Sequence, residues 1–383
     1  MQNRTLTSRR NLLKILSAGP MLPLSSALAG SSLLTACGGA GAIATPAVTG
    51  VSFSSMAAPG LTNPAAMATT TVGSVMSITY SDNSKADLKL SYQPFFVTGD
   101  LVPDGKGGQI LAGGYYDIQG RPIIDKTVAG KERQFFSDAP DGTSLLSVAG
   151  AKVDGVKGNT VFAVVQFEYT TFAQDGKTGM YGKLPSPIAV LTLDQNPQTG
   201  KLSLVKYHNV DTSAVNGLWI TCGASLSPWG THLSSEEYEP DAWVIDNHIQ
   251  NESLTLFQEF SKNTFGQTHV AKPYWYGHVP EVTVHPDGTG SIKKHYCLGR
   301  ISRELVQVMP DSKTVLMGDD ATSGGIFMFI ADTAGNLSSG TLYVAKIHQV
   351  SELNAGKFTL SWIRLGKATS AEIETLANQL KAT

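Results

Sequence analysis

The residues of this chain best suited to chemistry lie between positions 218 and 241. A thiol, Cys222, precedes a Pro-Trp-Gly turn at 228–230, and two adjacent carboxylates, Glu236 and Glu237, follow it. A strand-turn-strand of this length returns on itself, so a soft sulfur ligand and hard oxygen ligands can meet, as in a mixed-metal site. The same residues also fit a buried cysteine, a turn and a solvated acidic tip, because free cysteine is commonly buried and glutamate commonly exposed.

The hairpin motif resembles a known family signature. Cys222, Ser-Pro-Trp-Gly-Thr at 227–231 and Glu236-Glu237 resemble the segment that marks the PhoX-type alkaline phosphatases. Three further motifs resemble those of the same family in the same chain order, over about residues 90 to 345. They are Phe167-Glu168-Tyr169, then Leu298-Gly299-Arg300 with Arg303-Glu304, then Met317-Gly318-Asp319-Asp320 with Phe327-Met328-Phe329.

The resemblance implies a secreted phosphomonoesterase with a β-propeller fold that uses Fe3+ and Ca2+. Cys222 as thiolate is a strong iron ligand, and the resemblance makes Glu304 a second one. It also places Glu237, and with it Glu236, at calcium, which prefers several carboxylate oxygens. Further metal candidates by position are Glu168, Asp319 and Asp320. A solvated strand edge for Glu168 and a strand-end turn for the two aspartates remain alternatives.

The chain departs from the family pattern beside these candidates. Phe167 and Arg303 stand where histidines are usual, and Thr221 replaces an asparagine next to Cys222. A guanidinium beside a cation site is electrostatically unfavourable unless it points at the substrate phosphate or away from the metals. The direction of Arg303 therefore bears on whether the metal site is intact.

The amino terminus predicts export. Residues 8–14, Ser-Arg-Arg-Asn-Leu-Leu-Lys, form a twin-arginine signal, followed by a stretch too polar and too interrupted by proline for a membrane span. Leu34-Thr35-Ala36-Cys37-Gly38 fits a bacterial lipobox, which predicts a signal peptide over 1–36 and lipidation of Cys37. The alternative is an ordinary cleavage near residues 27–29. We expect a periplasmic or cell-surface lipoprotein whose partners are the twin-arginine export machinery and, through the lipid, the membrane.

The composition is typical of an exported globular protein. A formal net charge of -2 excludes a generally basic surface, so we expect no nucleic-acid partner. The 39 glycines and 42% hydrophobic residues favour a turn-rich β protein. After Cys37 only Cys222 and Cys297 remain, too few for a disulfide framework. A disulfide between these two cysteines is the main alternative to metal ligation.

The body of the chain reads as repeated β-hairpins. Residues 37–75 are poor in charge and rich in Ala, Gly, Ser and Thr, which predicts a flexible linker. Apolar runs separated by turn residues predict hairpins at 190–205, 281–294 and 327–344. The last two lie about 46 positions apart, close to the length of one propeller blade. A β-sandwich also fits the spacing, and the family resemblance favours the propeller over 76–383.

The end of the sequence predicts a helix rather than a strand. Thr369-Ser370-Ala371-Glu372 is a capping-box start, and Ile373, Leu376 and Leu380 follow at helical spacing. A propeller closes by pairing its last blade with its first. We therefore expect an all-β, incomplete propeller truncated at its carboxyl end, with apolar faces exposed near 341–364.

These observations predict a metal-dependent hydrolase of phosphomonoesters. A non-catalytic propeller scaffold or binding module, and a calcium-dependent propeller hydrolase of another ester, are the alternatives. The three classes differ in the metal they carry, namely iron with calcium, none, or calcium alone.

Overall fold

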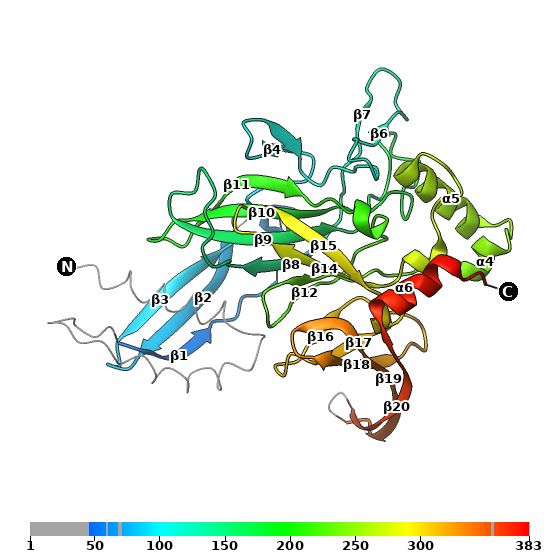
Figure 1. Cartoon of the computed structure of the whole chain (residues 1–383). Helices are drawn as coiled ribbons and strands as arrows, with labels where there is room; N and C mark the ends of the chain where they lie inside the picture. Colours follow the sequence, from blue (N-terminus) through cyan, green and yellow to red (C-terminus); the bar gives the residue numbers. More distant parts are fainter. Residues whose placement is uncertain (1–45, 59, 68–70, 354–355, 383) are drawn as a thin grey trace. The chain divides into compact units, whose positions relative to one another are not determined.

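The computed structural model describes residues 46–58, 60–67, 71–353 and 356–382 (Figure 1). The twin-arginine segment and Cys37 lie outside the described residues, so their roles stay predictions. The chain divides into two units. The smaller unit holds residues up to Phe95 with Lys157–Asn159 and Gln195–Ser203, and the larger holds Phe96–Val156, Thr160–Asp194 and Leu204–Thr383.

The smaller unit is built on a three-stranded antiparallel sheet. Its strands are β1 (Val48–Phe53), β2 (Thr71–Tyr80) and β3 (Lys85–Ser91), in that order, with the short helix α3 (Pro64–Met67) before β2. Alternating residues of β3 are half-buried, as in a sheet with one covered face. Ile78 and Tyr80 form the core of this unit. Residues 48–53 therefore differ from the flexible linker expected there, because β-branched and aromatic residues alternate within the otherwise small-residue segment.

The larger unit contains five antiparallel sheets among its described residues. One sheet has the order β11-β10-β9-β8, another β12-β13-β14-β15, and a third runs from β16 to β20 in sequence order; β4 pairs with β5, and β6 with β7. The bounds are β4 Leu101–Pro103, β5 Gln109–Leu111, β6 Ile124–Asp125, β7 Arg133–Gln134, β8 Pro140–Leu146, β9 Asn159–Phe167, β10 Ile188–Gln195, β11 Leu202–Asn209, β12 Ser225–Leu226, β13 His232–Leu233, β14 Val279–Val284, β15 Gly290–His295, β16 Val306–Val308, β17 Thr314–Gly318, β18 Ile326–Thr333, β19 Asn336–Ser351 and β20 Lys357–Thr369.

The three predicted hairpins are confirmed, whereas the propeller is not. β10 pairs with β11, β14 with β15 and β18 with β19, each across the expected turn. The chain is mostly β, but none of the six small antiparallel sheets formed by the described residues closes on itself. Turn chemistry specifies a hairpin locally, while the arrangement of sheets around an axis depends on packing that strand spacing does not determine.

In the described part of the larger unit, three α-helices accompany the sheets: α4 (Ala242–Asp246), α5 (Glu252–Phe265) and α6 (Ser370–Gln379). The capping box predicted for α6 is confirmed, since the Thr369 side chain accepts from the Glu372 amide and Glu372 accepts from the Thr369 amide. α5 buries Phe257 and Phe260 against Trp219, which anchors the start of the 218–241 segment. None of the helices within the described residues is both long and apolar enough to span a bilayer.

β19 and β20 form a long two-stranded ribbon that extends beyond the shorter strands of their sheet (Figure 1). Its apolar side chains Ile347, Phe358, Leu360 and Ile363 are all about half exposed. The exposed apolar residues expected near 341–364 are thus present.

Candidate metal centre

The 218–241 segment folds as two stretches that run beside each other. The short strands β12 and β13 pair across the Pro-Trp-Gly turn, and further from the turn the Glu237 amide donates to the Ile220 carbonyl at 3.0 Å. Ile220 and Tyr238 adopt left-handed backbone conformations, with φ of 35° and 46°. Such strain in residues other than glycine tends to collect at functional sites. Here it flanks Cys222 and Glu237.

Cys222 meets two carboxylates from elsewhere in the chain. Asp141 lies in β8 and Glu168 follows β9, and one carboxylate oxygen of each lies within 4.8 Å of the other and of the Cys222 sulfur. The Gly142 amide donates to the Cys222 carbonyl at 3.2 Å. A Cβ at Gly142 would lie only 2.6 Å from the Ala224 backbone nitrogen, so glycine permits the approach that brings Asp141 to the thiol.

Glu237 and Asp320 extend this group. The Cys222 thiol donates to the carboxylates of Asp141 and Glu237. The Glu237 carboxyl in turn donates to Asp320. The Asp320 amide donates to the Ser302 carbonyl at 2.7 Å, which fixes this aspartate. We refer to Asp141, Glu168, Cys222, Glu237 and Asp320 as the acidic cluster.

The acidic cluster carries no balancing positive charge from its own members. Burial, followed by the charges of Asp141 and Glu304, raises the pKa of Glu168 to about 7. Burial and the hydrogen bond to Asp320 raise the pKa of Glu237 to about 8. Burial, with Glu237 and Asp141, also raises the pKa of the Cys222 thiol. Because neighbouring negative charges and burial both disfavour the ionised forms, a bound cation would stabilise the ionised carboxylates and the thiolate.

The donor set therefore fits the metals that the family resemblance implies. A thiolate is a soft ligand that suits iron, and several carboxylate oxygens around it suit calcium. Asp141 was missed by the sequence analysis, because no motif marks it. Only its register in β8, opposite the Cys222 segment, brings it into the group.

Glu236 faces away from the acidic cluster. Its carboxylate accepts from the Lys294 ammonium at 3.0 Å, from the Trp219 amide at 3.0 Å, and from the amides of Gly277 and His278 at 3.0 Å each. Successive side chains of an extended segment point to opposite sides, so the predicted pair Glu236 and Glu237 is divided between two environments. Glu236, proposed from the sequence as a calcium ligand, is occupied by these structural partners.

The remaining predicted residues lie around the acidic cluster. The charge of Glu304 acts on Glu168, and its backbone carbonyl accepts from the Ser235 hydroxyl at 2.8 Å. Arg303 is fully buried and donates to the carbonyls of Gly277, Leu298 and Gly299 at 2.8, 3.2 and 2.7 Å. Its guanidinium is thus hydrogen-bonded to backbone oxygens, and the carboxylates that act electrostatically on its charge are Glu236, Glu239 and Asp319.

The alternative disulfide is wrong. Cys222 and Cys297 are both free and buried. Cys297 belongs to a different core cluster, where its thiol donates to the Leu337 carbonyl at 3.1 Å. The Cys222 sulfur therefore remains available as a ligand.

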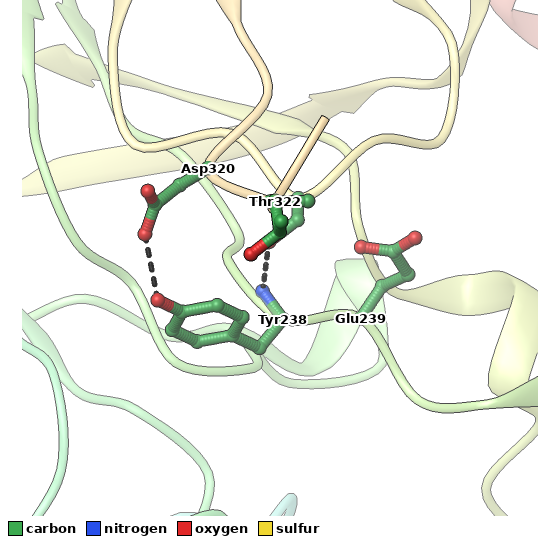
Figure 2. A pocket seen from close by; sticks show the side chains of 6 residues that line it. Tyr238, Glu239, Asp320 and Thr322 are labelled. Atoms are coloured by element: carbon green, nitrogen blue, oxygen red, sulfur yellow. Dashed lines mark hydrogen bonds between the residues drawn. The ribbon is translucent and has the colours of Figure 1, made fainter. Parts of the chain in front are cut away.

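Three tyrosines adjoin the acidic cluster, and two of them, Tyr181 and Tyr238, were not singled out by the sequence analysis. Tyr169 follows Glu168 directly, and its ring meets that of Tyr181 edge-on at a centroid distance of 4.9 Å. Burial and the charges of Glu237 and Glu168 raise the pKa of Tyr181. The Tyr238 hydroxyl donates to Asp320 at 2.6 Å (Figure 2), and this bond raises the Tyr238 pKa to about 12.

A cavity of about 490 Å³ opens next to Asp320. Six residues line it: Tyr238, Glu239, Ser302, Asp320, Ala321 and Thr322 (Figure 2). Because Asp320 belongs to both the cavity and the acidic cluster, a molecule in this cavity lies beside the candidate metal ligands.

Comparison with known proteins gives one family. Residues 195–382 match the family model described as alkaline phosphatase PhoX. This stretch contains Cys222, Glu236, Glu237, Glu304, Asp319 and Asp320, whereas Asp141 and Glu168 lie before it. No curated protein matches the chain.

Proposed function

Because the chain belongs, through residues 195–382, to the PhoX-type alkaline phosphatase family, we propose that it is a metal-dependent phosphomonoesterase that releases inorganic phosphate from organic phosphates. Family membership supports a phosphatase in general. The observation that carries the finer statement is the convergence of Asp141, Glu168 and Cys222 within 4.8 Å, with Glu237 hydrogen-bonded to the same thiol.

Within this proposal, the acidic cluster and the neighbouring Glu304 hold the metals. Cys222 and Glu304 are the iron candidates, and Glu237, Glu168 and the aspartates Asp141 and Asp320 offer oxygens for calcium. Bound metal ions supply Lewis acids that neutralise the negative charge developing on a transferring phosphoryl group. The members of the cluster are acidic or neutral, so attraction of a phosphate to this point depends on that metal charge.

The chain's own residues hold the ligands in place. Tyr238 donates to Asp320, and the Glu237 carboxyl donates to the same aspartate, so the aspartate is held from two sides. Glu168 and Glu237 each have a raised pKa, which cation binding would lower by favouring the charged form. Metal loading is therefore expected to release protons.

The proposed compartment is outside the cytoplasm. The twin-arginine motif and the lipobox at Cys37 support export of a folded, metal-loaded protein that is then tethered by lipid. Mass spectrometry of the mature protein tests this, because an unmodified amino terminus at Gly30 or Ser31 would contradict lipidation.

Metal analysis and an activity assay test the function together. The full chain, purified after export, should carry iron and calcium and should hydrolyse p-nitrophenyl phosphate, with Cys222→Ala losing both iron and activity. Calcium without iron would favour a hydrolase of another ester, and a protein without metal would favour a binding scaffold. Loss of activity in Cys222→Ala with iron retained would contradict the role of the thiol.

A further inference from the structure

The cavity beside the acidic cluster has a distinctive lining. It offers two carboxylates, Glu239 and Asp320, two hydroxyls, Ser302 and Thr322, and the phenol ring of Tyr238. No lysine, arginine or histidine is among the six lining residues. In Figure 2 the Tyr238 hydroxyl points toward Asp320, and the Glu239 carboxylate lies on the other side of Thr322.

One carboxylate oxygen of Glu239 has no hydrogen-bond partner among the described residues. That oxygen is the buried Oε2, whereas Oε1 lies 4.0 Å from a terminal nitrogen of Arg300. A buried carboxylate oxygen without a partner is costly, and a positive charge brought into the cavity that Glu239 lines would reduce that cost through electrostatic attraction.

Tyr238 is held in place although it is about half exposed. Its amide donates to the Ser302 hydroxyl at 2.7 Å, its carbonyl accepts from the Trp219 indole at 2.9 Å, and its own hydroxyl donates to Asp320 at 2.6 Å. The left-handed backbone at φ 46° is maintained by these contacts. A fixed aromatic ring beside carboxylates is the arrangement that recognises organic ammonium groups.

We propose that this cavity receives the organic group of the phosphomonoester and selects esters that carry an ammonium group over esters that carry a second negative charge. The inference rests on the proposed function, since the metals at the acidic cluster would hold the phosphate end. Glu239 and the Tyr238 ring are then the specificity-determining groups, because they line the cavity without belonging to the candidate metal ligands. The carboxylates of Glu239 and Asp320 would repel a second anion.

A comparison of three esters tests this inference. The full metal-loaded protein is assayed with choline phosphate, glycerol phosphate and 3-phosphoglycerate, whose organic groups are cationic, neutral and anionic. We expect the highest kcat/KM for choline phosphate and the lowest for 3-phosphoglycerate. In Glu239→Gln and in Tyr238→Leu, the ratio of kcat/KM for choline phosphate to that for glycerol phosphate should fall about two- to fivefold. Glu352→Gln, an exposed acid outside the cavity lining, is the matched control and should leave this ratio unchanged.

Two further measurements distinguish failure of the inferred specificity from failure of the proposed function. Tyr238→Phe keeps the ring and should keep the preference, so a fall as large as in Tyr238→Leu would contradict the role of the ring. Calorimetric titration with choline alone should show binding to the wild type and weaker binding to Glu239→Gln. Choline binding without hydrolysis of any ester would contradict the proposed function and support the cavity's ligand class. Hydrolysis with no choline binding and equal ester ratios in all variants would overturn the inference and leave the proposed function standing.

Discussion

Glu236 and Glu237 are neighbours in the chain, yet their surroundings are opposite. Glu236 is matched by the buried ammonium of Lys294 and by three backbone amides. Glu237 lies among Cys222, Glu168 and Asp320, and no cationic side chain of the described residues is bonded to it. The first environment is internally neutralised, which is typical of a structural ion pair. The second is left negative, at a cost to stability, as expected of residues kept for a ligand.

The largest effect on stability is expected at the neutralised pair. Lys294→Met removes the ammonium and leaves the Glu236 carboxylate buried, so the free energy of unfolding should fall by about 3–5 kcal/mol. Lys293→Met is the matched control, because Lys293 is exposed and its pair with Glu281 is backed by His295. It should cost less than about 1 kcal/mol. Urea unfolding measures both, and equal losses would contradict the distinction between the two lysines.

The next largest effect on the free energy of unfolding is expected from acid, through protonation of His232. Its ring is fully buried between the Ser144 hydroxyl and the Gln166 amide oxygen, and burial lowers its pKa to about 3. As the pH falls, the unfolded chain binds a proton at His232 first, because the pKa of a histidine there is about 6.5. The stability that the neutral, buried His232 contributes is therefore fully present above about pH 6.5 and is lost as the pH falls toward 3. The loss by pH 4 is on the order of 3 kcal/mol.

His232→Gln should flatten this part of the stability profile. Unfolding by urea between pH 7 and pH 4 measures the difference between the variant and the wild type. A parallel profile in the two proteins would show that His232 is not the titrating group.

A smaller loss is expected where the backbone approaches Cys222. Gly142→Ala places a Cβ about 2.6 Å from the Ala224 nitrogen, so it should cost about 1–3 kcal/mol and move Asp141 away from the thiol. Bound metal should decrease with it. Gly179→Ala, where a Cβ meets nothing within 4 Å, should change neither stability nor metal content. Full metal binding by Gly142→Ala would exclude Asp141 as a ligand.

The smallest effect on stability is expected within the acidic cluster. With its pKa raised to about 8, the Glu237 carboxyl is mostly protonated at pH 7 without metal and donates to Asp320. Glu237→Gln puts a neutral amide, also a donor, in its place, so in chelator the free energy of unfolding should stay within about 1 kcal/mol of the wild type. Metal affinity should nevertheless fall at least about 10- to 100-fold. A strong loss of stability in chelator would place Glu237 with Glu236 as a structural residue.

Local structure was largely predictable from the sequence. The hairpins around 190–205, 281–294 and 327–344 follow from turn residues between apolar runs, and α6 follows from hydrogen bonds between Thr369 and Glu372. The strand at 48–53 was not predicted, because its small residues resemble a linker until β2 pairs with it. The propeller expectation concerned how sheets are arranged, and strand spacing carries no such information.

The candidate site was predictable only in part. The motifs around Cys222, Glu237, Glu168 and Asp320 mark residues that the structure brings together. Asp141, Tyr181 and Tyr238 carry no motif of their own. They join the site through the register of β8 against the Cys222 segment and through the left-handed backbone at Tyr238.

The sequence by itself determined the hairpins, the capped final helix and the family, because turns, caps and motifs depend on residues close together in the chain. Only the tertiary structure decided which of two adjacent glutamates faces the candidate metals, that Arg303 donates to backbone carbonyls, and that Asp141 reaches Cys222. These outcomes depend on contacts between residues tens of positions apart. Burial and charge balance at those contacts, rather than the identity of neighbouring residues, fix where each side chain points.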